Sequence, residues 1–433
     1  MKIAIVADDL TGACDTGVQL VQYDLDVSVV IQSDTNDLET NKDVIIFNTD
    51  SRAMTNDQAY LTVSETCEQI KEMTFDIVYK KIDSTMRGNI GSELNAIYDK
   101  FQPDFVFITP AHPSNRRVVK DGIHYLDGIK LSKTEVANDP KTPVHESDVS
   151  KLIQHSSGRS VKHLTYKDLR KGNDFIRKRL RNWKKQGISY ITVDAVIEED
   201  LKRLMDVMNS DYRSVLCGSA GLINYLPALL GYRVQEERNN IQPNNKPVLF
   251  VVGSISKVGR QQLEHLLSSS DVVGVEMDSA KILTGYEVKE KEVTDIQSTI
   301  KEAIMAGKSV ALYSSADVDN VKTVGIDKGI HPTEISDWIS KALGDIAVSI
   351  VKALKIRNLF LTGGDTAQQV FTRLRIKNYQ LIGELELGVP IGKIGTQDEI
   401  ITVTKAGSFG TIQVMTNVLK QLNNSSQDNK VNF

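Results

Sequence analysis

The sequence predicts an α/β protein of two domains, each a mostly parallel sheet flanked by helices, with the active site in the cleft between the domains. The chain has 433 residues, more than a single hydrophobic core usually organises. Short apolar runs alternate with helical patterns, which is typical of parallel sheets. Several of these runs end in polar or glycine-rich turns, the position at which open α/β sheets bind their ligands.

The first domain is predicted for residues 1–235. A basic run at residues 169–185 predicts a helix whose charged face is solvated. Residues 122–162 are polar with few periodic apolar positions, so we expect an excursion or flap there rather than a sheet element. The predicted strands are residues 2–7, 24–31, 43–48, 76–82, 105–109, 190–196 and 215–222.

A polar stretch without periodicity, residues 236–246, predicts a linker. The second domain is predicted for residues 247–422, with a long helix at residues 333–354. Residues 423–433 carry no apolar pattern, and we expect a disordered tail. The strands predicted in this domain are residues 247–253, 309–313, 359–362 and 400–404.

Composition excludes several classes of protein. The net charge of -4 argues against a nucleic-acid partner, since nucleic-acid affinity rests on basic surface. No apolar run approaches the length of a membrane span, so we expect no membrane partner. The cysteines Cys14, Cys67 and Cys217 are widely spaced and lack zinc spacing, which favours small buried residues in a reducing cytoplasm.

Acidic and basic residues follow three strands of the first domain. Asp8 and Asp9 come directly after the first strand, and a helix cap would need only one of them. Arg52 follows the strand at residues 43–48, and Asp83 and Arg87 follow the strand at residues 76–82. Arginine grips a carboxylate with two parallel hydrogen bonds. These residues predict a pocket for a hydroxylated, anionic small molecule; the alternative is a set of caps and surface ion pairs of little value.

The first domain also contains two adjacent strand lysines and a loop histidine. Lys80 and Lys81 alternate faces of their strand, so one of them should point toward the same edge. His112 lies between prolines in a rigid loop, and we assign it no catalytic role.

The second domain offers three turns in which a strand is followed by glycine or serine and then a helix. They are residues 253–256, 363–366 and 407–410. Backbone N–H groups in such turns, together with a helix N-terminus, suit a polyphosphate. One such motif alone is weak evidence, and an ordinary capped turn is the alternative reading. The P-loop is absent, since residues 388–394 are one residue short of it, and no Rossmann fingerprint follows the first strand.

Together the two halves predict a kinase that acts on a small polyol acid. Phosphoryl transfer mainly requires positioning and charge neutralisation, with backbone N–H groups holding the phosphates of ATP and Mg²⁺ bridging them. A carboxylate would orient the attacking hydroxyl. The alternatives are a phosphotransferase for another sugar acid and a non-catalytic sensor of a nucleotide or sugar acid.

The chain resembles the four-carbon acid sugar kinase family over nearly its whole length. The resemblance implies a sugar-acid-binding N-terminal domain, a nucleotide-binding C-terminal domain, and transfer from ATP to the terminal 4-hydroxyl of threonate, erythronate or 3-oxo-tetronate. Residues 15–19 resemble the threonate and erythronate kinases more than the oxo-tetronate branch, so D-threonate or D-erythronate is our first candidate substrate. The motifs that carry the resemblance are residues 7–13, 81–88, 109–113, 218–222, 252–254, 362–366 and 405–410.

We assign roles as hypotheses. Arg52 and Arg87 bind the substrate carboxylate, and Asp9 and Asp83 hold its hydroxyls. Asp365 is the first candidate for orienting the attacking 4-hydroxyl, with Asp9 as its rival. The expected substrate-binding set is Asp8, Asp9, Arg52, Lys81, Asp83, Ser84 and Arg87. The expected nucleotide-binding set is Ser254, Gly363, Gly364, Asp365, Thr366, Gly407, Ser408 and Gly410. The metal ligands and the substrate stereochemistry stay open, and a homo-oligomer is compatible with the sequence.

Overall fold

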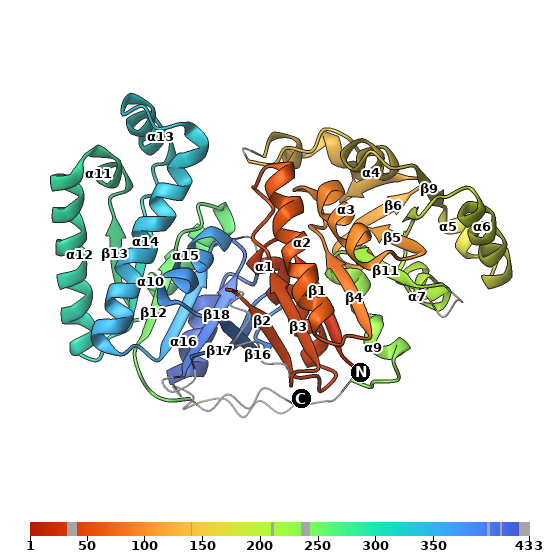
Figure 1. Cartoon of the computed structure of the whole chain (residues 1–433). Coiled ribbons are helices and arrows are strands. Elements are labelled where there is room, and N and C mark those ends of the chain that lie inside the picture. The colour runs from red at the N-terminus through yellow and green to blue at the C-terminus, as the bar shows by residue number, and fades with distance from the viewer. Residues whose placement is uncertain are drawn as a thin grey trace. The chain divides into compact units, whose positions relative to one another are not determined.

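The computed structural model describes residues 1–32, 41–139, 141–208, 212–234, 243–395, 399–407 and 409–423 (Figure 1). The chain divides into two compact units, Met1–Glu236 and Glu237–Phe433. The predicted linker lies outside the described residues except for 243–246. The predicted tail lies outside them except for Asn423, which is the last residue of a helix.

The first unit contains a parallel sheet with the strand order β2-β3-β1-β4-β11-β5-β10-β9. The central strand β1 is buried on both faces, as its unbroken apolar sequence predicts. Because β3 and β4 flank β1 in parallel, the turns that follow these three strands meet at one edge of the sheet. The strands are β1 Ile3–Ala7, β2 Val27–Val30, β3 Val44–Asn48, β4 Ile77–Lys81, β5 Phe105–Thr109, β9 Val161–Leu164, β10 Tyr190–Val193 and β11 Ser214–Gly218.

Helices connect these strands and cover the sheet. Helix α1 packs against α8, whereas α2 packs against α3 and α3 against α4. In the basic helix α6, Ile176, Leu180 and Trp183 are buried at helical spacing, which confirms the predicted helix with a solvated charged face over residues 173–185. The first residues of the predicted range, 169–172, lie outside α6, because Leu169 ends α5 and Gly172 is the N-cap of α6. The helices are α1 Leu10–Val21, α2 Asn56–Glu72, α3 Ile90–Phe101, α4 Val149–Ser157, α5 Tyr166–Leu169, α6 Asn173–Lys185, α7 Glu198–Met208, α8 Ala220–Ile223 and α9 Leu226–Leu229.

The expectation of a flap without sheet elements at residues 122–162 is wrong. Strands β6 (Arg117–Lys120), β7 (Ile123–Leu126) and β8 (Ile129–Lys130) form a small antiparallel sheet, and β9 joins the main sheet. Each turn of the small sheet is an Asp-Gly pair with both residues at positive φ, the conformation of tight hairpins. Strands of two to four residues are too short to leave a periodic apolar pattern, which explains the error.

The second unit contains a sheet with the order β13-β14-β12-β15-β18-β17-β16. It is parallel from β13 to β18, and β17 and β16 add an antiparallel edge. In chain order the strands are β12 Val248–Val252, β13 Val273–Met277, β14 Val310–Ser314, β15 Asn358–Thr362, β16 Asn378–Glu384, β17 Pro390–Ile394 and β18 Ile400–Lys405. Of these, β13, β16 and β17 had not been predicted from the sequence.

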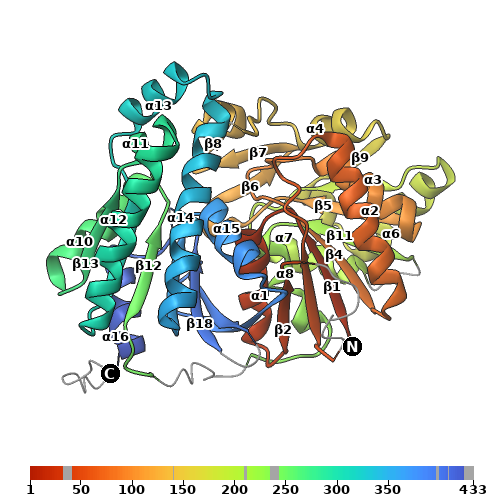
Figure 2. The same ribbon diagram turned by 60° about the vertical axis from the view of Figure 1, so that its left-hand side comes forward.

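The helices of this unit pack in pairs: α14 contacts α15 and α12, and α10 contacts α16. Figure 2 shows the long α14 beside α15. The core between the layers includes Phe250 and Phe360, whose ring centroids are 5.3 Å apart. No helix in the described part of the chain is apolar over a stretch that could cross a membrane. The helices are α10 Lys257–Ser269, α11 Ser279–Thr284, α12 Tyr286–Met305, α13 Val318–Asp327, α14 Pro332–Leu354, α15 Gly364–Leu374 and α16 Val414–Asn423.

Candidate active site

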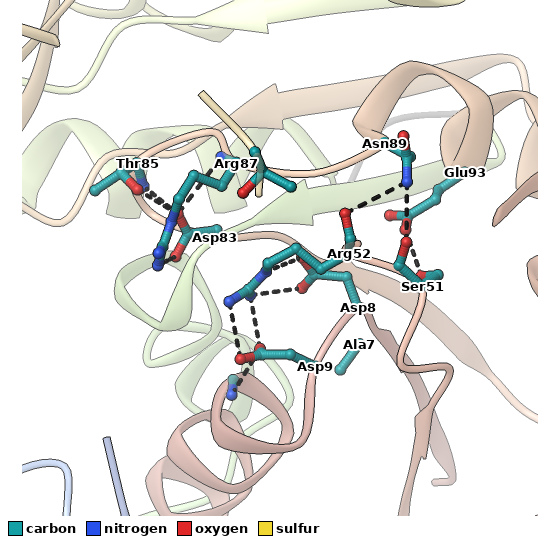
Figure 3. A network of polar contacts seen from close by, with 12 residues as sticks. Ala7, Asp8, Asp9, Ser51, Arg52, Asp83, Thr85, Arg87, Asn89 and Glu93 are labelled. Atoms are coloured by element: carbon teal, nitrogen blue, oxygen red, sulfur yellow. Dashed lines mark hydrogen bonds and ion pairs between the residues drawn. The ribbon is translucent and has the colours of Figure 1, made fainter. Parts of the chain in front are cut away.

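Arg52 joins the two aspartates that follow β1. Its Nε and Nη2 donate to the two carboxylate oxygens of Asp8 at 2.7 and 3.1 Å, and its Nη1 and Nη2 donate to those of Asp9 at 2.8 and 2.6 Å (Figure 3). Asp9 is also the N-cap of α1 and accepts the Gly12 N–H at 2.9 Å. One arginine therefore fixes both carboxylates at the sheet edge, with only guanidinium geometry able to make all four contacts.

Asp83 and Arg87 form a second pair in the turn after β4. The Arg87 guanidinium donates to both oxygens of Asp83, at 2.8 and 3.1 Å, and its Nη1 reaches Asp139 at 3.2 Å. Thr85 donates to Asp83 through its N–H, at 3.2 Å, and through its hydroxyl. The turn is thus tied to the loop that carries Asp139, and Figure 3 shows this pair beside the Arg52 cluster.

A network of polar side chains supports the turn that carries Arg52. The Lys80 ammonium lies 2.8 Å from the Glu93 carboxylate, which also accepts from the Ser51 hydroxyl. Asn89 donates through its side-chain amide to the carbonyl oxygens of Ser51 and Met54 at 2.9 and 2.8 Å. These contacts hold the backbone on both sides of Arg52, so the guanidinium is positioned by buried neighbours rather than by the aspartates alone.

Lys81 points to the opposite face of β4 from Lys80, toward α1. A Cβ placed on Gly12 would lie 2.8 Å from the Lys81 Nζ and 2.5 Å from an Asp9 oxygen, so only glycine leaves room for both groups there. The side chain of Lys81 is 4% exposed. The expectation that one of the two lysines points toward the charged edge is confirmed.

Arg117, on β6, was not predicted as a site residue. Its guanidinium donates to the Ser84 hydroxyl, in the same turn as Asp83. On β7, the His124 Nε2 lies 2.8 Å from the Ser84 carbonyl oxygen. The small sheet β6–β8, which was not predicted from the sequence, therefore contacts and supports the turn that follows β4. The only sequence signal for Arg117 was its place in the charged loop after β5.

Asp15 is the other residue missed by the sequence reasoning. It lies on α1, six residues after Asp9, and Lys81, Asp9 and Arg117 are the charged groups that act on its carboxyl. Burial raises the pKa of Asp15, and the Lys81 ammonium opposes that rise. Asp15 therefore belongs to the same charged cluster.

Burial and neighbouring charges shift the pKa values of the aspartates in different directions. Burial raises the pKa of Asp9 and outweighs the Arg52 guanidinium, with the Asp8 charge adding to the rise. For Asp8, burial is outweighed by Arg52 and then Lys80, so its pKa lies below the ordinary value. For Asp83, burial is outweighed by Arg52 and Arg87, which hold its pKa well below its usual range. Paired acids with pKa values pushed apart are typical of functional sites.

The cations of this site differ in what they already bind. Arg52 and Arg87 are each engaged with two aspartates. No carboxylate among the described residues lies within ion-pair distance of Lys81 or Arg117. Among the described residues, Lys81 and Arg117 are therefore two cations of this edge that have no ion-paired carboxylate, in contrast to Arg52 and Arg87.

In the second unit the three glycine turns lie side by side. They follow β12, β15 and β18, which are parallel neighbours in the sheet, so the three turns begin at one edge. A Cβ on Gly253 would lie 1.9 Å from the Thr366 hydroxyl oxygen, and one on Gly407 would lie 2.2 Å from the Ser254 hydroxyl oxygen. The turns pack so closely that a side chain at either glycine would displace its neighbour.

The N-terminus of α15 has the features of an anion site. Its N-cap is Gly363, at φ +100°, and no side chain in the described ranges caps the helix, in contrast to α10, where Ser256 accepts the Gly259 N–H. Asp365 and Thr366 lie in the first helical turn. An uncapped N-terminus leaves backbone N–H groups for a ligand oxygen. Gly410 is at φ +79°, and the predicted site residue Ser408 lies outside the described residues.

This cradle of glycines fits a polyphosphate, because backbone can approach where a Cβ would collide. Within the described ranges, no group of three or more His, Cys, Asp or Glu side chains is arranged to hold a metal ion. The three cysteines are free and buried, and burial raises the pKa of Cys67 to about 12, as expected of inert thiols.

Comparison with known proteins assigns a class to each half of the chain. Residues 3–226 match the model of a sugar-binding N-terminal domain, and residues 249–415 match that of a nucleotide-binding C-terminal domain. A sugar-binding domain followed by a nucleotide-binding domain is the arrangement of a two-domain sugar kinase.

Relatives narrow this class. A D-threonate kinase of Salmonella typhimurium is 30% identical over 429 residues, covering 97% of this chain and 98% of the relative. A D-erythronate kinase of Heliobacterium modesticaldum is 27% identical over 419 residues, 94% of each chain. A solved Haemophilus influenzae structure shares the fold, with a TM-score of 0.76 at 23% identity over 97% of this chain and 100% of that one. The chain belongs to the four-carbon acid sugar kinase family.

Proposed function

We propose that the chain is an ATP-dependent kinase that transfers the γ-phosphoryl group to the terminal 4-hydroxyl of D-threonate or D-erythronate. The observation that carries the proposal is the pairing of two sites in one chain. One is an edge of buried acids and cations after β1, β3 and β4, and the other is an edge of three glycine turns after β12, β15 and β18. The first suits a hydroxylated acid and the second suits a polyphosphate.

The substrate acid binds at the first edge. Arg52 and Arg87 direct positive charge toward its carboxylate, while Asp9 and Asp83 accept hydrogen bonds from its hydroxyls. Lys81 supplies a buried ammonium that has no carboxylate partner among the described residues. Asp8 and Ser84 complete the set by holding Arg52 and Arg117 in place. Orientation of the acid by several fixed groups is how the enzyme exposes one hydroxyl to transfer.

ATP binds at the second edge through Ser254, the turn from Gly363 to Thr366, and the turn from Gly407 to Gly410. Bound Mg²⁺ neutralises phosphate charge during transfer.

Asp365, in the first turn of α15, orients the attacking hydroxyl and accepts its proton. Asp9 is the rival for this role, and its raised pKa suits a proton acceptor. An Asp365→Asn enzyme should lose kcat with little change in nucleotide affinity, whereas Asp9→Asn should also raise the KM for the acid.

The test is ADP release with Mg-ATP and a panel of four-carbon acids. The panel contains D-threonate, D-erythronate, their L-forms and the 3-oxo-tetronates, and it is run beside buffer without acid. Turnover on D-threonate or D-erythronate supports the proposal and names the substrate. Turnover on a 3-oxo-tetronate alone keeps the kinase and replaces the substrate. Silence across the panel from protein that still binds ATP would favour a sensor or a kinase for a longer acid.

The three free, buried cysteines favour a reducing compartment, and we place the enzyme in the cytoplasm.

A further inference from the structure

Lys405, the last residue of β18, is a buried lysine that has no acidic partner among the residues that the structure describes. Its side chain is 2% exposed, and its Nζ donates to the carbonyl oxygens of Ala406 at 2.8 Å and Gly407 at 3.1 Å. The Thr362 hydroxyl oxygen is 3.5 Å away. No carboxylate in the described part of the chain lies within ion-pair distance of it. Burying an ammonium among neutral groups is costly, so such a residue is retained for a reason other than stability.

The ammonium lies where two of the glycine turns meet. Lys405 pairs with Thr362 across the β15–β18 ladder, and its carbonyl oxygen accepts the Gly363 N–H at 3.2 Å. The Gly407 carbonyl oxygen accepts from both the Lys405 ammonium and the Ser256 hydroxyl, the latter at 2.8 Å. Lys405 therefore contacts the end of β15 and the turn after it through its side chain and backbone, and it shares the Gly407 carbonyl oxygen with Ser256 of the turn after β12.

We propose that Lys405 is a buried cation of the nucleotide edge. It fixes the turn at residues 406–407, and a bound polyphosphate provides the negatively charged partner for its ammonium. Nucleotide binding is then coupled to protonation of Lys405. The inference rests on the proposed function, since it needs a nucleotide at this edge, and it adds a residue that the sequence-based site set did not contain.

The surroundings of Lys405 set the direction of this coupling. Burial lowers the pKa of Lys405 to about 8, and the carboxylate of Glu386, which accepts from the Thr411 N–H at 2.6 Å and from the Asn417 side chain, opposes the shift. Asp365 is the acidic residue in the first turn of α15, the helix that begins two residues after Thr362. The hydroxyls of Ser254 and Ser256 do not titrate in this range. A polyphosphate placed nearby raises the pKa, so the protein takes up protons on binding near pH 8, and affinity falls as the pH rises through that value.

Calorimetry of Mg-ADP binding to the full chain tests this. Titrations at pH 8 in two buffers of different ionisation enthalpy give the number of protons exchanged. The wild type should take up about half a proton per site at pH 8 and almost none at pH 6.5, because a group is half protonated at its pKa. Lys405→Met should lose the uptake at pH 8 and bind Mg-ADP about tenfold or more weakly at pH 7.

The matched control is Lys393→Met. Lys393 lies on the neighbouring strand β17, is paired with Glu399 at 2.9 Å, and is 37% exposed, so its replacement should change neither quantity. Wild type that binds Mg-ADP without proton uptake at pH 8 overturns the inference and leaves the proposed function intact. So does a Lys405→Met protein that keeps the uptake, since the residue would then be structural only. Wild type that binds no nucleotide overturns both.

Discussion

The ammonium of Lys80 and the carboxylate of Glu93 lie 2.8 Å apart, and neither side chain is exposed. The pair joins β4 to α3 beneath the sheet edge. Glu93 also accepts from the Ser51 hydroxyl, next to Arg52. The ion pair therefore connects the core of the first unit to the position of the arginine that holds Asp8 and Asp9.

Breaking this pair should destabilise the first unit strongly. Lys80→Met leaves Glu93 as an uncompensated buried charge, with an expected loss of about 3–5 kcal/mol in the free energy of unfolding. The double variant Lys80→Met/Glu93→Leu removes both charges and should lose less than the single variant. Urea unfolding followed by tryptophan fluorescence measures this. In a Trp338→Phe background the signal comes from Trp183 in α6, so it reports the first unit.

Arg116→Met is the matched control for the buried pair. Arg116 is paired with Asp127 at 2.8 Å, but the two side chains are 80% and 58% exposed. An exposed pair contributes only about 0–1 kcal/mol, so this variant should unfold like the wild type. Equal losses for the buried and the exposed variant would contradict the supporting role of Lys80 and Glu93.

Arg52→Lys should abolish most activity without unfolding the protein. A lysine ammonium cannot make the four contacts that Arg52 makes with Asp8 and Asp9, so the two carboxylates separate and the acid site loses its geometry. We expect kcat/KM for the acid to fall by about 100-fold, the effect of misplacing reacting groups. The Kd of Mg-ADP should stay unchanged because Arg52 belongs to the first unit. A kinetic assay with saturating ATP and calorimetry with ADP give the two quantities.

Arg87→Ala should change how stability depends on pH. The pKa of Asp83 lies well below its unfolded value, so this carboxylate contributes stability that is present above about pH 4 and is lost as the pH falls toward its folded pKa. Without Arg87 part of that contribution disappears at pH 7, about 1–3 kcal/mol, and stability falls less steeply as the pH drops below about 4. Urea midpoints at several pH values, read from Trp183, check both effects.

Lys151→Ala provides the reference for that measurement. Lys151 is 73% exposed and 3.8 Å from Asp148, so its removal should leave the pH profile of the wild type. A profile for Arg87→Ala that is parallel to the wild type would show that Asp83 does not depend on Arg87.

Gly253→Ala should weaken nucleotide binding selectively. The new Cβ would lie 1.9 Å from the Thr366 hydroxyl oxygen, so the turn after β12 or the start of α15 must move. We expect the Kd of Mg-ADP to rise by about tenfold or more, as for a displaced set of hydrogen bonds. Gly285→Ala, where a Cβ meets nothing within 4 Å, should bind ADP like the wild type. An unchanged Kd for both variants would remove the turn at residues 253–256 from the nucleotide site.

The sequence was sufficient to predict the parallel sheets and the convergence of the polar turns. Buried parallel strands have unbroken apolar runs, and such runs revealed β1, β5 and β12. The turns after them were recognisable because Asp-Asp and Gly-Ser are unusual directly after a buried strand. The Asp-rich and Arg-rich turns meet because β3 and β4 flank β1, which parallel connection rules favour.

The partnerships within the site could not be predicted. Arg52 and Arg87 were assigned to a substrate carboxylate, a role that stays a prediction, and the structure shows both engaged with aspartates. Which acid an arginine meets depends on backbone positions that come from separate strands. Arg117 was missed for a related reason: it lies on a four-residue strand of a hairpin sheet, too short for a periodic pattern. Asp15 was missed because an aspartate on a helix usually faces solvent.

The two lysines that end β4 have a consequence for how this chain can vary. Lys80 and Lys81 are adjacent, both buried, and committed to opposite faces: one to Glu93, the other to the space beside Gly12. Sliding β4 by one residue would exchange their faces and still present an ammonium on each side, so charge alone does not define the alignment of this strand. The alignment must come from groups that cannot be interchanged, such as Tyr79, whose hydroxyl donates to the Ser219 carbonyl oxygen at 2.7 Å. The Tyr79 hydrogen bond thus sets the register of β4 and, with it, the faces on which Lys80 and Lys81 lie.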